Sequence, residues 1–187
     1  MPAPLRRVCV FCGASSGAGA SYGAAARELG AALARRDITL VFGGGSVGLM
    51  GHVADGALAA GGTVVGVITR LLNDRELGHK SISTMHVTET MHERKAKMAD
   101  LADAFIALPG GIGTLEEFFE AWTAGYLGMH DKPVVMLDPI GHYDGLLAWL
   151  HGLVDSGYVA KGALDRLVVV GDVEAAMAVC APSDGGH

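Results

Sequence analysis

The hydrophobic residues of this chain gather in short runs that alternate with longer amphipathic stretches. The runs are rich in Val, Ile and Leu and apolar throughout, as expected for strands of a sheet covered on both faces. We predict strands at Arg7–Cys12, Ile38–Phe42, Thr63–Ile68, Met85–Thr88, Ala104–Leu108, Val134–Leu137 and Leu167–Val170. The stretches between them have helical spacing, and we predict helices at Tyr22–Arg35, Leu49–Ala60, Glu89–Leu101, Leu115–Leu127, Tyr143–Asp155 and Val173–Cys180.

This alternation predicts the fold class. Strands that alternate with helices are typical of a single Rossmann-like α/β domain, a doubly wound and mainly parallel sheet of about seven strands with helices on both faces. We expect the domain to span residues 1–181, with a loose C-terminal tail at 182–187. Ligands bind such sheets outside the carboxyl ends of the strands.

Composition narrows the class of protein. The chain has 187 residues, enough for one domain with a full core, and half of them are hydrophobic. No apolar stretch approaches the length of a membrane span, and Met1–Arg7 lacks the apolar core of a signal peptide. We therefore expect a cytoplasmic protein without a membrane partner. The net charge of −6 argues against a nucleic-acid surface.

Cysteine and histidine usage gives no sign of a metal site. The three cysteines, an odd number, do not suggest a disulfide framework. Cys9 and Cys12 form a C-x-x-C, but residues three apart on a strand point to opposite faces, so we expect both in the core. The eight histidines are scattered, with no H-x-x-x-H pair.

Three glycine-rich turns follow predicted strands, at Cys12–Gly17, Gly43–Gly48 and Pro109–Gly113. Glycine lets backbone N–H groups turn inward, and a helix start adds partial positive charge, so such turns suit phosphate. Gly43, Gly45 and Gly48 match G-x-G-x-x-G, a weak dinucleotide signal. Arg70, after the next strand, could accept a 2′-phosphate, so a phosphorylated dinucleotide stays open beside a plain tight turn.

The turn at Pro109 leads to the most informative residue, Glu117. Thr114-x-x-Glu117 alone favours a helix capping box. A cap needs neither the proline nor the three glycines before it, whereas a phosphate cradle does. A carboxylate beside a phosphate is awkward for binding alone, but it makes sense if positive charge develops there during a reaction.

A basic segment lies upstream. Met91, Met98 and Phe105 fall seven apart and predict one buried stripe, on which Arg94 and Lys95 also lie, while Lys97 falls on the solvent side. The two cations either border a cleft or extend to solvent along the helix edge. Ser15, Ser16 and Ser46 lie in the glycine turns, where they either cap helices or bind ligand oxygens. His130–Pro133 is interpreted as a polar turn before a strand.

Two motifs together resemble a known family. Pro109–Glu117 reads P-G-G-x-G-T-x-x-E and Met91–Lys95 reads M-x-x-R-K, as in the Lonely Guy (LOG) family of cytokinin riboside 5′-monophosphate phosphoribohydrolases. Further matches lie at Cys12–Ser15, Gly43–Gly45, Gly48–Gly51, Asp103–Leu108 and His130–Pro133, so the resemblance covers about Val8 to Val170. Ala14 is a small departure, since many relatives carry serine there.

The resemblance implies hydrolysis of the N-glycosidic bond of an N6-modified adenosine 5′-monophosphate, giving the free base (a cytokinin) and ribose 5-phosphate. It implies no cofactor or metal, a nucleoside monophosphate as the small-molecule partner, and a homodimer. By motif matching, Arg94 and Glu117 are the catalytic pair. Substrate-binding residues are expected at Ser15, Gly44, Gly45, Met91, Lys95, Gly110, Gly111, Gly113 and Thr114.

The chemistry is consistent with these roles. Cleavage of the N-glycosidic bond builds positive charge on the ribose. The carboxylate of Glu117 either stabilises this charge or activates the attacking water. Arginine stays protonated, so we expect Arg94 to orient Glu117 through a bidentate contact rather than act as an acid. The proton for the leaving base comes from water or from Glu117.

Two alternatives stay open: a broad purine or pyrimidine nucleoside monophosphate nucleosidase, and a non-enzymatic nucleotide or cofactor carrier. Some relatives carry the label lysine decarboxylase, but nothing in this sequence resembles a pyridoxal phosphate site.

Overall fold

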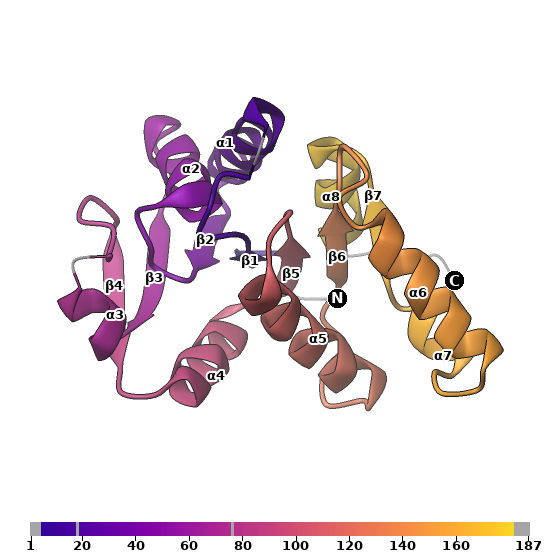
Figure 1. The fold of residues 1–187 in the computed structure, drawn as a ribbon. Helices are drawn as coiled ribbons and strands as arrows, with labels where there is room; N and C mark the ends of the chain where they lie inside the picture. The colour runs from indigo at the N-terminus through magenta and orange to yellow at the C-terminus, as the bar shows by residue number, and fades with distance from the viewer. Residues whose placement is uncertain (1–4, 18, 76, 182–187) are drawn as a thin grey trace.

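The computed structural model describes residues 5–17, 19–75 and 77–181. Its strands form one sheet in the order β4-β3-β2-β1-β5-β6-β7, and every neighbouring pair is parallel (Figure 1). The strands are β1 (Arg7–Phe11), β2 (Thr39–Phe42), β3 (Val64–Thr69), β4 (Thr84–Thr88), β5 (Ala104–Ala107), β6 (Val134–Leu137) and β7 (Val168–Val170). The doubly wound sheet predicted from the sequence is confirmed.

Helices cover both faces of the sheet. They are α1 (Ala20–Ala34), α2 (Gly48–Ala59), α3 (Arg70–Asp74), α4 (Met91–Leu101), α5 (Ile112–Tyr126), α6 (Asp144–Asp155), α7 (Lys161–Leu164) and α8 (Val173–Cys180). Residues of α1, α2 and α8 form one buried apolar cluster with the sheet, and residues of α4 to α7 form the other. The short helices α3 and α7 were not predicted, because about one turn is too short to show helical periodicity.

The two apolar clusters account for the burial of Cys9 and Cys12. Cys9 lies in the cluster under α4 and α5, whereas Cys12 lies in the cluster under α1 and α2. Both are free and buried, which confirms their prediction as core residues. Burial raises the pKa of each thiol, so neither is a ready nucleophile.

The stripe predicted along α4 is only partly buried. Met98 and Phe105 lie in the core, but the expectation for Met91 was wrong, since 46% of it is exposed. Met91 is the first residue of α4, whereas the residues of this helix that join the apolar cluster lie in its second half. Within the described ranges, no helix is long and apolar enough to cross a membrane. The predicted tail at 182–187 lies outside the described residues.

Strand β1 lies between β2 and β5, so the order of the strands reverses there. In an open parallel sheet this switch point is where the turns that leave neighbouring strands diverge and create a crevice. The turns after β1, β2 and β5 are the three glycine-rich segments. The topology therefore brings together the segments that the sequence marked as anion sites.

Candidate active site

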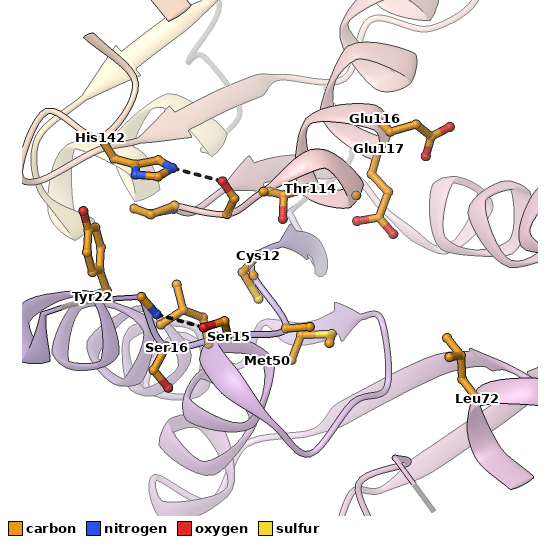
Figure 2. Close-up of a pocket in the computed structure, with 18 of the residues that line it drawn as sticks. Cys12, Ser15, Ser16, Tyr22, Met50, Leu72, Thr114, Glu116, Glu117 and His142 are labelled. Atoms are coloured by element: carbon orange, nitrogen blue, oxygen red, sulfur yellow. Dashed lines mark hydrogen bonds between the residues drawn. The ribbon is translucent and has the colours of Figure 1, made fainter. Parts of the chain in front are cut away.

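A cavity of about 830 Å³ opens at this switch point (Figure 2). Its lining comes from the turns after β1, β5 and β6 and from the starts of α1, α2, α4 and α5, with Leu72 from α3. Figure 2 shows Ser15 and Met50 on one wall, Thr114 and Glu117 on the other, and Leu72 apart from them at one end. The volume falls within the range usual for small-molecule sites.

Backbone hydrogen bonds tie the three glycine turns together at Gly13. The N–H of Gly13 donates to the carbonyl of Pro109 over 3.2 Å, and its own carbonyl accepts from the N–H of Leu49 over 3.0 Å. Gly48 has a φ of +62°, and a Cβ there would lie 2.3 Å from the carbonyl carbon of Ala14. Only glycine allows this approach. The turns therefore form one connected wall.

The start of α5 does not form the capping box that Thr114-x-x-Glu117 alone would favour. Helix α5 begins at Ile112 with Gly111 as its N-cap, which makes no side-chain cap, so Thr114 lies inside the helix. The buried Thr114 side chain packs on Gly110, where a Cβ would lie 2.1 Å from its Oγ1. The first helical amides have no carbonyl partner within the helix and, with the helix dipole, favour an anion.

A capping box does occur, but it lies at the start of α4. The hydroxyl of Thr90 accepts from the N–H of Glu93, and the carboxylate of Glu93 accepts from the N–H of Thr90. Such a reciprocal pair fixes the first turn of a helix. It therefore fixes the turn from which the Arg94 side chain projects.

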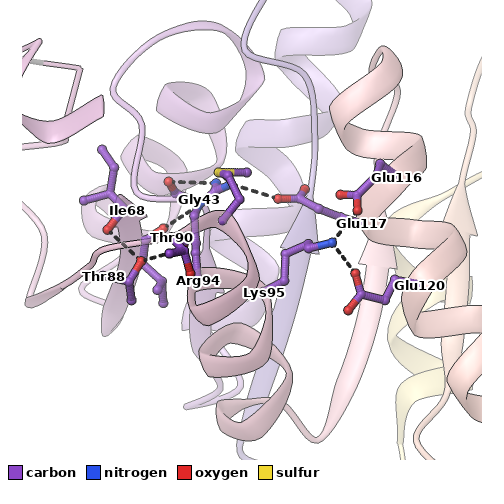
Figure 3. A network of polar contacts seen from close by, with 11 residues as sticks. Gly43, Ile68, Thr88, Thr90, Arg94, Lys95, Glu116, Glu117 and Glu120 are labelled. Atoms are coloured by element: carbon purple, nitrogen blue, oxygen red, sulfur yellow. Dashed lines mark hydrogen bonds and ion pairs between the residues drawn. The ribbon is translucent and has the colours of Figure 1, made fainter. Parts of the chain in front are cut away.

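The guanidinium of Arg94 is buried and holds three elements together (Figure 3). Its Nε donates to the Val67 carbonyl over 2.9 Å, and its Nη2 donates to the Gly43 carbonyl over 3.1 Å. Its Nη1 donates to Oε1 of Glu117 over 3.1 Å. The contact with Glu117 is therefore single rather than bidentate, because the other nitrogens bind the carboxyl ends of β2 and β3. The alternative in which Arg94 extends to solvent is ruled out by its burial.

Glu117 faces the cavity from the second turn of α5. Its side chain is only 11% exposed. Burial raises the pKa of this carboxyl to about 7, although the positive charge of Arg94 opposes the shift and Glu116 adds to it. The carboxyl therefore exchanges its proton near neutral pH, which suits a group that acts as a base or an acid.

Lys95 lies beside this pair but turns away from the cavity. Its ammonium pairs with the carboxylates of Glu116 and Glu120 on α5 (Figure 3). Lys95 lowers the pKa of Glu117, whereas Glu116 and Glu120 raise it. Lys95 therefore balances the acidic face of α5 next to the buried carboxyl.

The structure brings most of the predicted site residues together. Those that line the cavity are Ser15, Met91, Arg94, Gly110, Gly111, Gly113, Thr114 and Glu117. Gly44, Gly45 and Lys95 are not among the lining residues: the carbonyl of Gly44 accepts from the N–H of His79, and Gly45 pairs with Gly78. Arg70 pairs with Glu89. Among the described residues, no group of His, Cys, Asp and Glu is placed to hold a metal ion.

Sequence reasoning missed several lining residues, among them Tyr22, Leu72 and His142. His142 follows β6, so the rule that ligands bind at the carboxyl ends of strands could have marked it. Tyr22 lies in a predicted helix and Leu72 in the short helix α3 that was not predicted. Neither carries a chemical signal, so nothing in the sequence would have placed them here.

Comparison with known proteins identifies the family of the chain. A family model described as "possible lysine decarboxylase" matches residues 50–180. The cytokinin riboside 5′-monophosphate phosphoribohydrolase of Mycobacterium tuberculosis is 56% identical over 94% of both chains. The phosphoribohydrolase LOG3 of Arabidopsis thaliana is 47% identical over 88% of this chain and 76% of its own length.

Among solved structures, a molybdenum cofactor binding protein from Rippkaea orientalis superposes with a TM-score of 0.71 at 22% identity, covering 93% of this chain and 94% of its own. This likeness concerns the fold alone. The identity to the phosphoribohydrolases extends over most of the chain. The chain therefore belongs to the Lonely Guy (LOG) family, which the "possible lysine decarboxylase" family model also covers.

Proposed function

We infer that this protein hydrolyses the N-glycosidic bond of a cytokinin riboside 5′-monophosphate, releasing the N6-substituted adenine and ribose 5-phosphate. The observation that carries the inference is the buried Arg94–Glu117 pair, which lies beside a glycine cradle in one cavity. Relatives with that activity in their names share up to 56% identity with the chain. A protein that only binds a nucleotide has no use for a buried carboxylate beside the phosphate.

The geometry of α5 supports a division of the substrate along the helix. We propose that the first amides of α5 and the Gly110–Thr114 turn hold the phosphate. Glu117 lies five residues after Ile112, which corresponds to a rise of about 7.5 Å along the helix. A ribose held by its 5′-phosphate at the helix start would then extend toward the carboxyl group, so part of the barrier is met by positioning.

Glu117 and Arg94 then act on the bond itself. As the glycosidic bond breaks, positive charge develops on the ribose, and the ionised Glu117 stabilises it or takes a proton from the attacking water. Arg94 holds that carboxylate in place and stays charged throughout. Because the pKa of Glu117 is near 7, the same group could return the proton to the departing base.

The apolar end of the cavity supports a substituted base. Leu72 and Met91 both line the cavity; Figure 2 shows Leu72 at the end away from His142, and the Sδ of Met91 lies 3.9 Å from Nη1 of Arg94. A flexible methionine and a leucine provide a surface for an isoprenoid group, whereas unmodified AMP leaves it in contact with water. This favours the cytokinin monophosphate over the broad nucleosidase.

The decarboxylase description and the carrier alternative have less support. A pyridoxal phosphate enzyme needs a lysine for the Schiff base, and none of the described residues that line the cavity is a lysine. A carrier needs an anion site, but it has no need for the Arg94–Glu117 pair. Neither alternative accounts for the carboxyl with a pKa near 7.

We further propose that the enzyme works in the cytoplasm as a homodimer. Three buried free thiols are compatible with a reducing compartment. Large apolar side chains lie exposed at both ends of α5, at Ile112, Leu127 and Met129, where a second subunit could cover them. Light scattering should give twice the mass of the chain, and a monomeric mass would contradict the dimer.

The substrate is tested by incubating the protein with N6-isopentenyladenosine 5′-monophosphate, AMP and N6-isopentenyladenosine. Chromatography then quantifies the free base. We expect the fastest release from the modified monophosphate and none from the nucleoside. Equal rates for both monophosphates would favour the broad nucleosidase, and no release from any of the three would favour the carrier.

A further inference from the structure

Three consecutive carbonyls before α5 are each held by a donor from elsewhere in the fold. The phenol of Tyr143 donates to the carbonyl of Leu108 over 2.7 Å. The N–H of Gly13 donates to the carbonyl of Pro109 over 3.2 Å. The Nε2 of His142 lies 3.0 Å from the carbonyl of Gly110 and donates to it, since a carbonyl can only accept. Two of the three donors are adjacent residues in the turn between β6 and α6.

The turn that carries those donors is itself held by one buried carboxylate. Asp138 directly follows β6, and it is only 9% exposed. Its two oxygens accept from the N–H groups of His142 and Tyr143 over 2.8 and 2.7 Å. Burial, with the nearby Asp138, raises the pKa of Tyr143, so its hydroxyl remains a donor at working pH. Asp138 therefore sets the backbone from which both side chains reach the cradle.

Holding a carbonyl also aims the next amide. In a planar trans peptide the C=O of one residue and the N–H of the next point in opposite directions. Fixing the carbonyl of Gly110 therefore fixes the N–H of Gly111, the N-cap of α5. Gly110 and Gly111 have no side chain, so their backbone has more conformational freedom than that of other residues. The contact from His142 supplies the missing restraint from outside the turn.

We propose that His142, held by Asp138, is a positioning residue for phosphate recognition, because it keeps the Gly111 amide aimed at the substrate phosphate. This rests on the proposed function, in which that amide binds the 5′-phosphate. Figure 2 shows His142 at the rim of the cavity, with its hydrogen bond directed to the cradle. Tyr143 fixes the start of the same segment at Leu108, before the proline that has no N–H to aim.

Two substitutions separate this role from general support of the fold. His142→Ala removes the donor to Gly110, whereas His142→Gln keeps an N–H group at a similar reach. Position 142 is exposed to solvent, so both variants should fold. Calorimetric titration with AMP and with adenosine measures the contribution of the phosphate directly, without turnover. Base release by wild type from N6-isopentenyladenosine 5′-monophosphate is measured in parallel.

We expect His142→Ala to bind AMP at least tenfold more weakly and to bind adenosine as wild type does, and His142→Gln to recover most of the loss. Unchanged AMP affinity, or an equal loss for AMP and adenosine, would overturn the positioning role. If wild type releases no base, the proposed function fails instead. In that case the AMP titration still decides whether His142 positions an anion-binding amide.

Discussion

Replacing Arg94 by lysine is the most demanding test of how the site is built. The guanidinium donates to oxygens on three separate elements, at distances of 2.9, 3.1 and 3.1 Å. A lysine carries all its N–H groups on one nitrogen and cannot span them. At least two hydrogen bonds from a charged donor are lost, each contributing about 1.5–3 kcal/mol. We therefore expect the free energy of unfolding to fall by about 3–6 kcal/mol.

The same change should reduce turnover. Lysine keeps the positive charge but no longer fixes the carboxylate of Glu117, and a misplacement of about 1 Å costs roughly 100-fold in rate. Urea unfolding gives the stability, and base release at saturating substrate gives kcat. Arg70→Lys is the matched control, because its pair with Glu89 is exposed and screened by solvent. An Arg94→Lys protein with wild-type stability and kcat would refute the reasoning.

Other predictions follow from single contacts. Because the pKa of Glu117 is near 7 and its ionised form reacts, kcat/KM should rise as the pH passes about 7; a rise near 4.5 would contradict the burial argument. Lys95→Met removes a charge that lowers this pKa, so a pH–rate profile should show the rise at higher pH. Gly48→Ala should destabilise the fold more than Gly61→Ala, since both glycines have positive φ but only Gly48 meets backbone within 4 Å; equal urea midpoints would contradict this. Trp122→Phe should lower the free energy of unfolding by about 1 kcal/mol, because it removes the hydrogen bond from Trp122 Nε1 to the carbonyl of Ala163. An unchanged free energy of unfolding would count against this.

The five central strands could be predicted because they are buried on both faces, so their composition alone marks them. The start of α5 could not, because Ile112 and Gly113 look like part of a glycine turn. That error of three residues made Thr114 resemble an N-cap, whereas it lies inside the helix and packs on Gly110. The structure does contain a capping box, but it is formed by Thr90 and Glu93 at the start of α4.

For Arg94, the sequence pattern bears on its burial but not on its hydrogen-bond partners. Its place on an apolar stripe left open whether it borders a cleft or extends to solvent, and its burial beside the cavity decides for the cleft. Its acceptors are the backbone carbonyls of Gly43 and Val67, and a carbonyl has no sequence signature because every residue has one. For the same reason, the links from His142 and Tyr143 to the cradle become visible only when β5 and β6 lie side by side.

In the proposed reaction, cleavage of the N-glycosidic bond depends on the carboxylate of Glu117. The most direct test compares wild type, Glu117→Gln and Glu116→Gln in the release of base and ribose 5-phosphate from N6-isopentenyladenosine 5′-monophosphate. Glu116 is the matched control, because it is the neighbouring carboxylate, lines the same cavity and is half exposed. We predict equimolar products from wild type and Glu116→Gln, and a loss of at least about 100-fold in Glu117→Gln. Equal rates in all three proteins would contradict the account.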